Sequence, residues 1–277
     1  SRRQRQMCIR DSVKTIEAYG ENSKQLAIIT NPKVGSFSSD AREEKNQKLK
    51  ESLSASLKEN NNILYMYLLR ASSKPEKFIA RHADNMGTIC DDKDAISVYE
   101  AYFAETDVKY NLIPDESGFR RKISKNRVVL TDKFNKLDRN NDYIEVDDEP
   151  FSEDHLYYQE DGYVGFADYS VVGEEYNETG FAPYAVAIHI VYFDKDDSLR
   201  VKHFVSDSND DISDPAGKFQ EALSKLVAWN ETKQLDTVAM KEFEDLYHRE
   251  AYPGLGTVKK LSIMHHLELI GRYLDKE

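Results

Sequence analysis

Apolar runs alternate with charged stretches through the first half of the chain. Five apolar runs are predicted to be strands, and they cover residues 25–30, 62–69, 86–90, 108–113 and 126–131. Between them lie stretches with helical character, at residues 39–58, 75–84, 94–104 and 119–123. Apolar strands that alternate with helices are typical of βαβ units. The pattern therefore predicts an α/β fold with a parallel sheet.

The second half is richer in strands and then in helices. Three longer apolar runs predict strands at residues 163–168, 184–193 and 199–205, and the last two are joined as a hairpin. Three helices are predicted at residues 215–229, 239–249 and 257–274. No repeat or linker interrupts the pattern, so we expect a single α/β domain over residues 13–277. The number of parallel βα units suits a TIM-barrel-like fold, and an open sheet is the alternative.

The first twelve residues differ from the rest of the chain. The string SRRQRQMCIRDS has four Arg and one Asp in a chain whose net charge is -12. It resembles translated sequencing-adapter read-through of the kind found in metagenomic assemblies, and a genuine basic arm is the alternative. We interpret residues 1–12 as non-native. The native domain is then expected to begin near Val13, to lack its N-terminal strand, and to expose an apolar edge near residues 25–30.

Composition narrows the classes of function. No apolar run reaches the roughly 20 residues that span a bilayer, so no membrane association is expected. Two cysteines suit a reducing cytoplasm, and the negative charge argues against strong non-specific nucleic-acid binding. Neither GxGxxG nor GxxxxGK[ST] occurs, so no cofactor is predicted.

Two acidic stretches resemble calcium loops in their spacing. Residues 138–149 have Tyr143 at the sixth position, where the sharp turn needs Gly, and residues 207–218 end on Lys218 instead of Glu. We predict no metal site at either stretch.

Carboxylates and histidines are the candidate catalytic groups. Asp132 and Asp168 end predicted strands, where sheet and barrel enzymes place their chemistry. His189 shares one strand face with two alanines, and His203 lies on the next strand. A satisfied core histidine and a turn-forming aspartate are the alternatives. A Ser-His-Asp triad is not predicted, because no GxSxG motif occurs.

The start of the C-terminal helix is a candidate anion site. Gly254 and Gly256 form a tight turn with Thr257 as the expected cap, and Lys259 adds positive charge. Lys259, Ser262 and His266 fall on one line of the helix, within a face that also carries Leu267. A helix packed in the core is the alternative. We predict that His266 is buried within reach of His189, His203 or Asp168.

Several long motifs resemble one bacterial family. They are LAIITNPKVGSF, DGYVGFADYS, GFAPYAVAIHIVYFD, VKHFVSDSNDD, DPAGKFQEAL and PGLGTVKKLSIMHHLELIGRYL. The chain is similar in these motifs to an uncharacterised sce-type family catalogued by a myxobacterial locus tag, and more distantly to the phage beta-protein family. The resemblance implies a defence-associated role beside a nuclease-like protein partner encoded nearby, and it supplies no catalytic residues.

Two functions from different classes follow. The first is an accessory or interaction component of a phage-defence or mobile-element system. The alternative is a barrel-type enzyme acting on a phosphorylated or nucleotide substrate. For the enzyme, the candidate catalytic residues are Asp132, Asp168, His189, His203 and His266, and the candidate anion-binding residues are Gly254, Gly256, Thr257 and Lys259.

Overall fold

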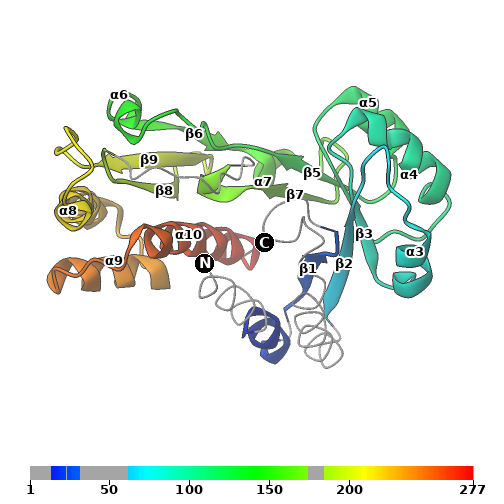
Figure 1. Ribbon diagram of the computed structural model, residues 1–277, viewed down its shortest axis with the longest axis horizontal. Helices are drawn as coiled ribbons and strands as arrows, with labels where there is room; N and C mark the ends of the chain where they lie inside the picture. Colours follow the sequence, from blue (N-terminus) through cyan, green and yellow to red (C-terminus); the bar gives the residue numbers. More distant parts are fainter. Residues whose placement is uncertain (1–13, 23, 32–61, 174–183, 277) are drawn as a thin grey trace. The chain divides into compact units, whose positions relative to one another are not determined.

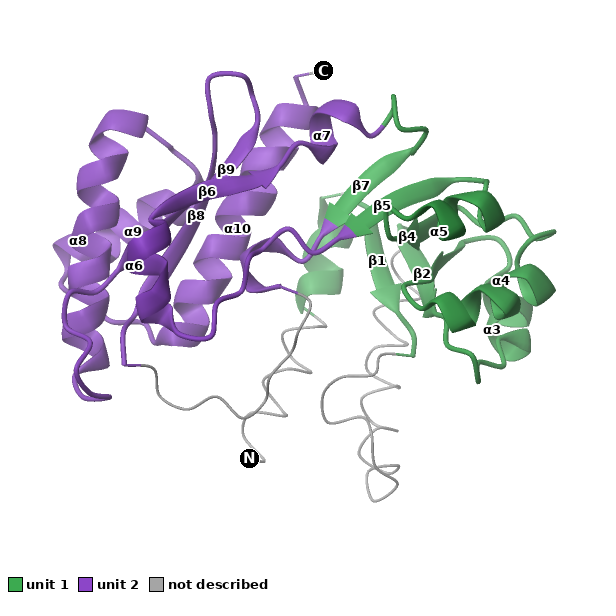
Figure 2. Ribbon diagram, turned by 90° about the horizontal axis from the view of Figure 1, so that it is seen from above, with its two compact units in different colours: residues 1–130, 159–167 green, residues 131–158, 168–277 purple. Residues whose placement is uncertain are grey.

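The computed structural model describes residues 14–22, 24–31, 62–173 and 184–276. The segment 1–12 and the predicted helix over 39–58 lie outside the described residues. The chain divides into two compact units (Figure 2). Unit 1 comprises residues 1–130 and 159–167, and unit 2 comprises residues 131–158 and 168–277. The single-domain expectation stays a prediction.

A parallel sheet organises the first half (Figure 1). Its strands follow one another in the order β1-β2-β3-β4-β5-β7. They are β1 (Leu26–Ile29), β2 (Ile63–Leu68), β3 (Met86–Ile89), β4 (Tyr110–Ile113), β5 (Arg127–Thr131) and β7 (Gly165–Asp168). Strands β1 to β5 pair in parallel with their neighbours in sequence, so the five predicted strands are confirmed. The sheet is a curled half-barrel, and a closed TIM barrel is not confirmed.

Short helices connect the parallel strands. They are α3 (Glu76–His82), the 3-10 turn η2 (Lys93–Ala95), α4 (Ile96–Tyr102) and α5 (Ser117–Lys122). The helices bury Phe78, Val98 and Phe119. β1 stands at the end of the strand order, and its Ile29 is 42% exposed. That exposure agrees with the predicted apolar edge.

Unit 2 contains an antiparallel sheet and the C-terminal helices. The strand order is β6-β9-β8. Its elements are η3 (Asn140–Asp142), α6 (Tyr143–Val146), β6 (Asp148–Ser152), α7 (Asp154–Tyr157), η4 (Ser170–Val172), β8 (Ala187–Phe193), β9 (Leu199–Val205), α8 (Pro215–Lys233), α9 (Val238–His248) and α10 (Leu255–Leu274). The hairpin β8–β9 and the three long helices confirm the sequence prediction, whereas β6 was not predicted.

The two faces of β8 pack into different clusters of the unit 2 core. Ile188 and Ile190 contact the side of α8, α9 and the first turns of α10. Ala187 and Val191 lie with Phe134 and other residues of the opposite cluster. The alternation predicted for this strand is therefore confirmed, and it assigns His189 to the second face.

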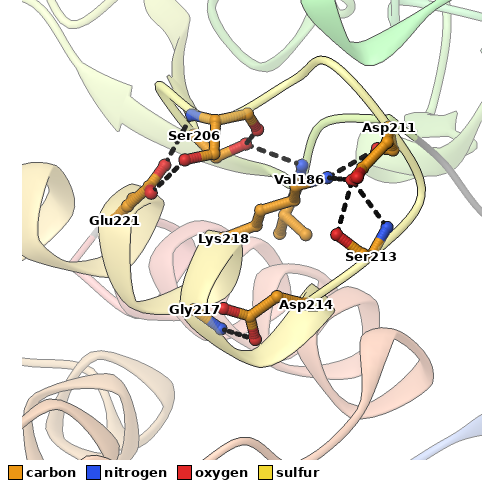
Figure 3. A network of polar contacts seen from close by, with 9 residues as sticks. Val186, Ser206, Asp211, Ser213, Asp214, Gly217, Lys218 and Glu221 are labelled. Carbon is orange, nitrogen blue, oxygen red and sulfur yellow. Dashed lines mark hydrogen bonds and ion pairs between the residues drawn. The ribbon is translucent and has the colours of Figure 1, made fainter.

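A polar network holds the loop before α8 (Figure 3). Asp214 has a left-handed conformation and caps the helix, and its carboxylate accepts a hydrogen bond from the Gly217 N–H. The buried Lys218 Nζ donates to the Asp211 backbone oxygen at 2.6 Å. On the other side, Glu221 accepts two hydrogen bonds from Ser208. The loop is thus fixed by side chains of the helix that it precedes.

Candidate functional site

The turn after β7 gathers carboxylate, hydroxyl and imidazole groups. Asp168 is the last residue of β7, and its Oδ1 accepts a hydrogen bond of 2.6 Å from the Ser170 N–H. Ser170 opens the 3-10 turn η4 with a φ of +53°. A non-glycine residue in that region is uncommon and costs conformational energy. The chain therefore holds Ser170 in a strained position directly after a strand of the half-barrel.

His266 reaches this turn from α10. Its Nδ1 lies 3.0 Å from Ser170 Oγ, and its Nε2 lies 3.7 Å from Asp168 Oδ2. The ring is buried and meets the Phe151 ring edge-on at a centroid distance of 5.2 Å. The prediction that His266 is buried beside Asp168 is confirmed. Three groups from two distant parts of the chain thus form one cluster, which we call the Ser170 cluster: Asp168, Ser170 and His266.

Burial governs the protonation of His266. Removal from water lowers the pKa of its imidazole below the ordinary value, while the charge of Asp168 opposes that effect. The ring is therefore neutral at neutral pH. A neutral imidazole can accept a proton at the nitrogen that faces a hydroxyl, and here that hydroxyl belongs to Ser170.

Asp132 lies against the end of the same turn. Its Oδ1 accepts a hydrogen bond from the Phe134 N–H at 3.1 Å, and the residue is exposed. Gly173, which follows η4, has a φ of +71°, and a Cβ atom at Gly173 would lie 3.2 Å from Asp132 Oδ2. The glycine thus leaves room for the carboxylate. The structure therefore brings Asp132 next to the turn that carries Ser170.

His189 and His203 form a second cluster on the antiparallel sheet. They are direct cross-strand neighbours, and their Nδ1 atoms lie 2.7 Å apart. His203 Nε2 lies 3.1 Å from Glu149 Oε1 of β6. A carboxylate only accepts hydrogen bonds, so His203 carries its proton on Nε2 and His189 donates from Nδ1. We call these three residues the Glu149 cluster.

Both imidazoles of the Glu149 cluster are neutral at neutral pH, and His203 is buried. Burial, then the neighbouring His203 and Lys259, lower the pKa of His189 to about 3. Burial also lowers the pKa of His203, and Glu149 opposes that change. The rings of Phe134 and Tyr143 pack against His189, at centroid distances of 5.0 and 4.7 Å. These contacts suit a core network as well as a catalytic one.

The start of α10 differs from its prediction in two respects. The helix begins at Leu255 with Gly254 at the N-cap, so Thr257 lies inside the first turn and its side chain caps nothing. Gly254 has a φ of +87°, which explains why glycine stands there. Lys259 is exposed, and Leu267, expected on the apolar face, is 60% exposed. Thr257 is not the cap because α10 starts two residues earlier, and Leu267 is exposed because the helix presents Ser262, His265 and His266 inward.

His265 was not singled out by the sequence, and it has a structural role. Its Nε2 lies 2.7 Å from the Val191 carbonyl oxygen, and its Nδ1 lies 2.8 Å from Thr237 Oγ1. The carbonyl can only accept, so Nε2 donates and Nδ1 accepts from the Thr237 hydroxyl. That hydroxyl also accepts from the Met240 N–H and so caps α9. Every polar atom of this contact is satisfied.

In the two stretches with calcium-like spacing, the side chains at potential ligand positions form hydrogen bonds with other groups of the protein. Glu149 contacts His203, and Asp142 accepts from the Arg139 N–H. Lys218 occupies the twelfth position of the second stretch and bonds back to Asp211. Within the described residues, no three His, Cys, Asp or Glu side chains are placed to hold a metal ion.

Ser170 is the site residue that sequence reasoning missed. No motif marks it, because a GxSxG pattern is absent and Ser170 is preceded by Tyr169 and Asp168. Its position depends on a backbone conformation and on a helix almost a hundred residues later in the chain. The available signal was the spacing of Asp168 and Ser170 directly after a predicted strand.

No family model, curated protein or solved structure matches this chain. Within the described part of the chain, no helix combines the length and apolarity needed to cross a membrane. The site must therefore be interpreted from its own geometry.

Proposed function

We propose that this protein is a cytoplasmic enzyme that uses His266 as an acid–base group at the carboxyl end of β7. One observation carries the proposal: the buried His266 imidazole lies 3.0 Å from a hydroxyl and 3.7 Å from a carboxylate. A neutral imidazole with these neighbours can take a proton and have the resulting charge stabilised. The carboxyl ends of parallel strands are also where half-barrel and barrel sheets bind substrates.

A phosphorylated or nucleotide substrate is part of the proposal. Lys259 is exposed on α10, seven residues before His266, which corresponds to about 10 Å along a helix. Its charge, together with the N-terminal end of α10 at Gly254 and Gly256, supports binding of a phosphate, whereas the Thr257 N–H already donates to the Gly254 carbonyl oxygen at 3.0 Å. The substrate would then place its phosphate near Lys259 and its reacting group near His266.

Calorimetry tests the phosphate contact. We expect inorganic phosphate and simple nucleotides to bind the wild-type protein and to bind Lys259→Ala at least tenfold more weakly. Lys276→Ala, which removes a lysine near the C-terminus, is the matched control and should bind like wild type. Equal affinities for wild type and Lys259→Ala would remove the phosphate from the proposal.

The second candidate function is an accessory component of a phage-defence or mobile-element system. It is favoured by exposed apolar residues on α10, namely Met264, Leu267 and Leu274, which are 37%, 60% and 41% exposed. Such residues support contact with a protein partner. Co-purification with a nuclease-like protein, if the neighbouring genes encode one, tests this role, and Leu267→Lys should weaken the association. A complex that is indifferent to Leu267→Lys would count against this surface, and the absence of a complex would count against the role.

A further inference from the structure

We propose that unit 2 binds a small aromatic carboxylate in a pocket between α6, β9 and α8. The pocket has a volume of about 270 Å³, close to the roughly 300 Å³ of the smallest ligand sites in proteins. That volume suits a ligand with one ring and one charged group. Neither Ser170 nor His266 lines the pocket, so the proposal is independent of the function proposed for the Ser170 cluster.

The pocket forms where β6 ends beside β9. The first residue of β6, Asp148, pairs with Lys202, whereas β9 continues to Val205. One further hydrogen bond joins the two segments, from the His203 N–H to the Asp147 carbonyl oxygen at 2.8 Å. The end of β9 therefore lines the pocket, and α6 and α8 supply its remaining walls.

Apolar side chains of the pocket can hold a planar ring. Trp229 of α8 lines it and is half-buried. The indole packs edge-on against the buried Phe204 ring, with 5.3 Å between the ring centroids, and this contact fixes its position. Ile144 of α6 also lines the pocket and is 48% exposed. A flat ring in the pocket would cover apolar surface of both Trp229 and Ile144 and could stack on the indole.

Two lysines supply the positive charge. Lys202 Nζ donates to Asp147 Oδ2 at 2.5 Å, and Lys225 Nζ donates to Asp207 Oδ1 and to the Val205 carbonyl oxygen, both at 2.7 Å. The side chains of Asp147 and Asp207 are 64% and 78% exposed. Ion pairs with such exposed carboxylates contribute little to stability. A ligand carboxylate can therefore replace Asp147 on Lys202 at little cost.

The charge balance favours a carboxylate over a phosphate. The charges of Lys202 and Lys225 are matched by those of Asp147 and Asp207. A monoanion that takes the place of the Asp147 carboxylate adds one negative charge, and the displaced side chain turns into water. A phosphate dianion would add two negative charges beside the same aspartates and would be repelled more strongly.

Fluorescence of the full chain tests the pocket, because Trp229 is its only tryptophan. We expect benzoate to change the emission of Trp229 with saturation. Benzamide has the same shape without the charge, and acetate has the charge without the ring, so each should bind at least tenfold more weakly. Inorganic phosphate should leave the emission unchanged. A response to benzoate that does not saturate, equal affinities for benzoate and benzamide, or saturable binding of phosphate would overturn the proposal.

Variants assign the anion contact. Lys202→Met should bind benzoate at least tenfold more weakly and benzamide like wild type. Lys195→Met, which removes an exposed lysine from the loop between β8 and β9, is the matched control and should bind both like wild type. Circular dichroism confirms that each variant is folded.

A variant with the opposite effect keeps the test decisive if Lys202→Met fails to fold. Asp147→Asn removes the carboxylate that competes for Lys202, and asparagine accepts the φ of +57° at this position. It should bind benzoate at least threefold more tightly than wild type. Unchanged or weaker binding of benzoate by Asp147→Asn would overturn the proposal.

Discussion

The imidazoles of His189 and His203 face each other across the β8–β9 pair, with their Nδ1 atoms 2.7 Å apart. The contact requires one protonated and one bare nitrogen. Glu149 fixes which is which, because His203 donates its single ring proton from Nε2 to the Glu149 carboxylate, and its Nδ1 is then bare. Protonation of both rings would place two positive charges within hydrogen-bonding distance in the core. The pair therefore makes the fold sensitive to acid.

The unfolding free energy should fall as the pH drops below about 6.5. The folded state keeps His189 neutral to about pH 3 and His265 neutral to about pH 4, because burial lowers both pKa values. Unfolded histidines take up protons near 6.5, so acid favours the unfolded state. Each of the two histidines then lowers the unfolding free energy by about 1.4 kcal/mol per pH unit as the pH falls from 6.5 to 4. Denaturant titrations at pH 7, 6 and 5 measure the slope.

One variant assigns part of that slope. His189→Gln should flatten the pH dependence of the unfolding free energy by about one proton. Identical slopes in wild type and His189→Gln would show that His189 titrates alike in both states.

Removal of the Glu149 carboxylate should destabilise unit 2. In Glu149→Ala the buried His203 N–H loses its acceptor, which costs about 1–3 kcal/mol. Glu149→Gln retains an acceptor oxygen, so it should lose less unfolding free energy than Glu149→Ala. Urea denaturation at pH 7 compares the two variants, and equal losses would mean that the charge, not the hydrogen bond, stabilises His203.

Thr237 links α9 to α10, and its hydroxyl is the essential group. Thr237→Val removes both the cap of α9 and the donor to His265, and we expect a loss of about 1–3 kcal/mol. Thr237→Ser keeps the hydroxyl and should remain close to wild type. Thermal unfolding followed by circular dichroism compares the stabilities of the two variants with that of the wild type. A stable Thr237→Val protein would contradict the hydrogen-bond assignment.

Gly173 should tolerate no side chain. Gly173→Ala combines a φ of +71° with a Cβ atom 3.2 Å from Asp132 Oδ2, so we expect a loss of about 1–3 kcal/mol. Gly118 in α5 has open space around its Cβ position and no positive φ, so Gly118→Ala should stabilise by about 0.5–1 kcal/mol. Opposite shifts in the midpoint of urea unfolding are the expected result.

Hydrophobic patterning predicted the half-barrel strands well, because each is a short apolar run bounded by polar residues. It could not predict β6, whose residues Asp148 and Glu149 look like a loop. The strand forms because these carboxylates meet Arg200 and His203 on β9, and those partners lie about fifty residues later in sequence. Local hydrophobic patterning cannot predict an ion pair whose two partners are far apart in the sequence.

The candidate site was predicted only in part, for a similar reason. Helical spacing placed His266 inside the core, and the end of a strand placed Asp168 near it. Ser170 depends on a left-handed backbone conformation, which composition does not encode unless glycine or asparagine marks it. The exposure of Leu267 was missed because an apolar residue on a helix gives no sign of whether a partner covers it.

The loop before α8 contains its own counter-ion. Lys218 occupies the position at which a calcium loop places its last ligand, and its ammonium bonds to the Asp211 carbonyl. A cation attached to the chain has a fixed local concentration, whereas a diffusible ion must be recruited from solution at some binding equilibrium. The order of this loop is therefore independent of calcium supply. In a calcium-binding loop, a change in calcium concentration switches the loop between two states. Here the cation is the Lys218 ammonium, which is a permanent part of the chain.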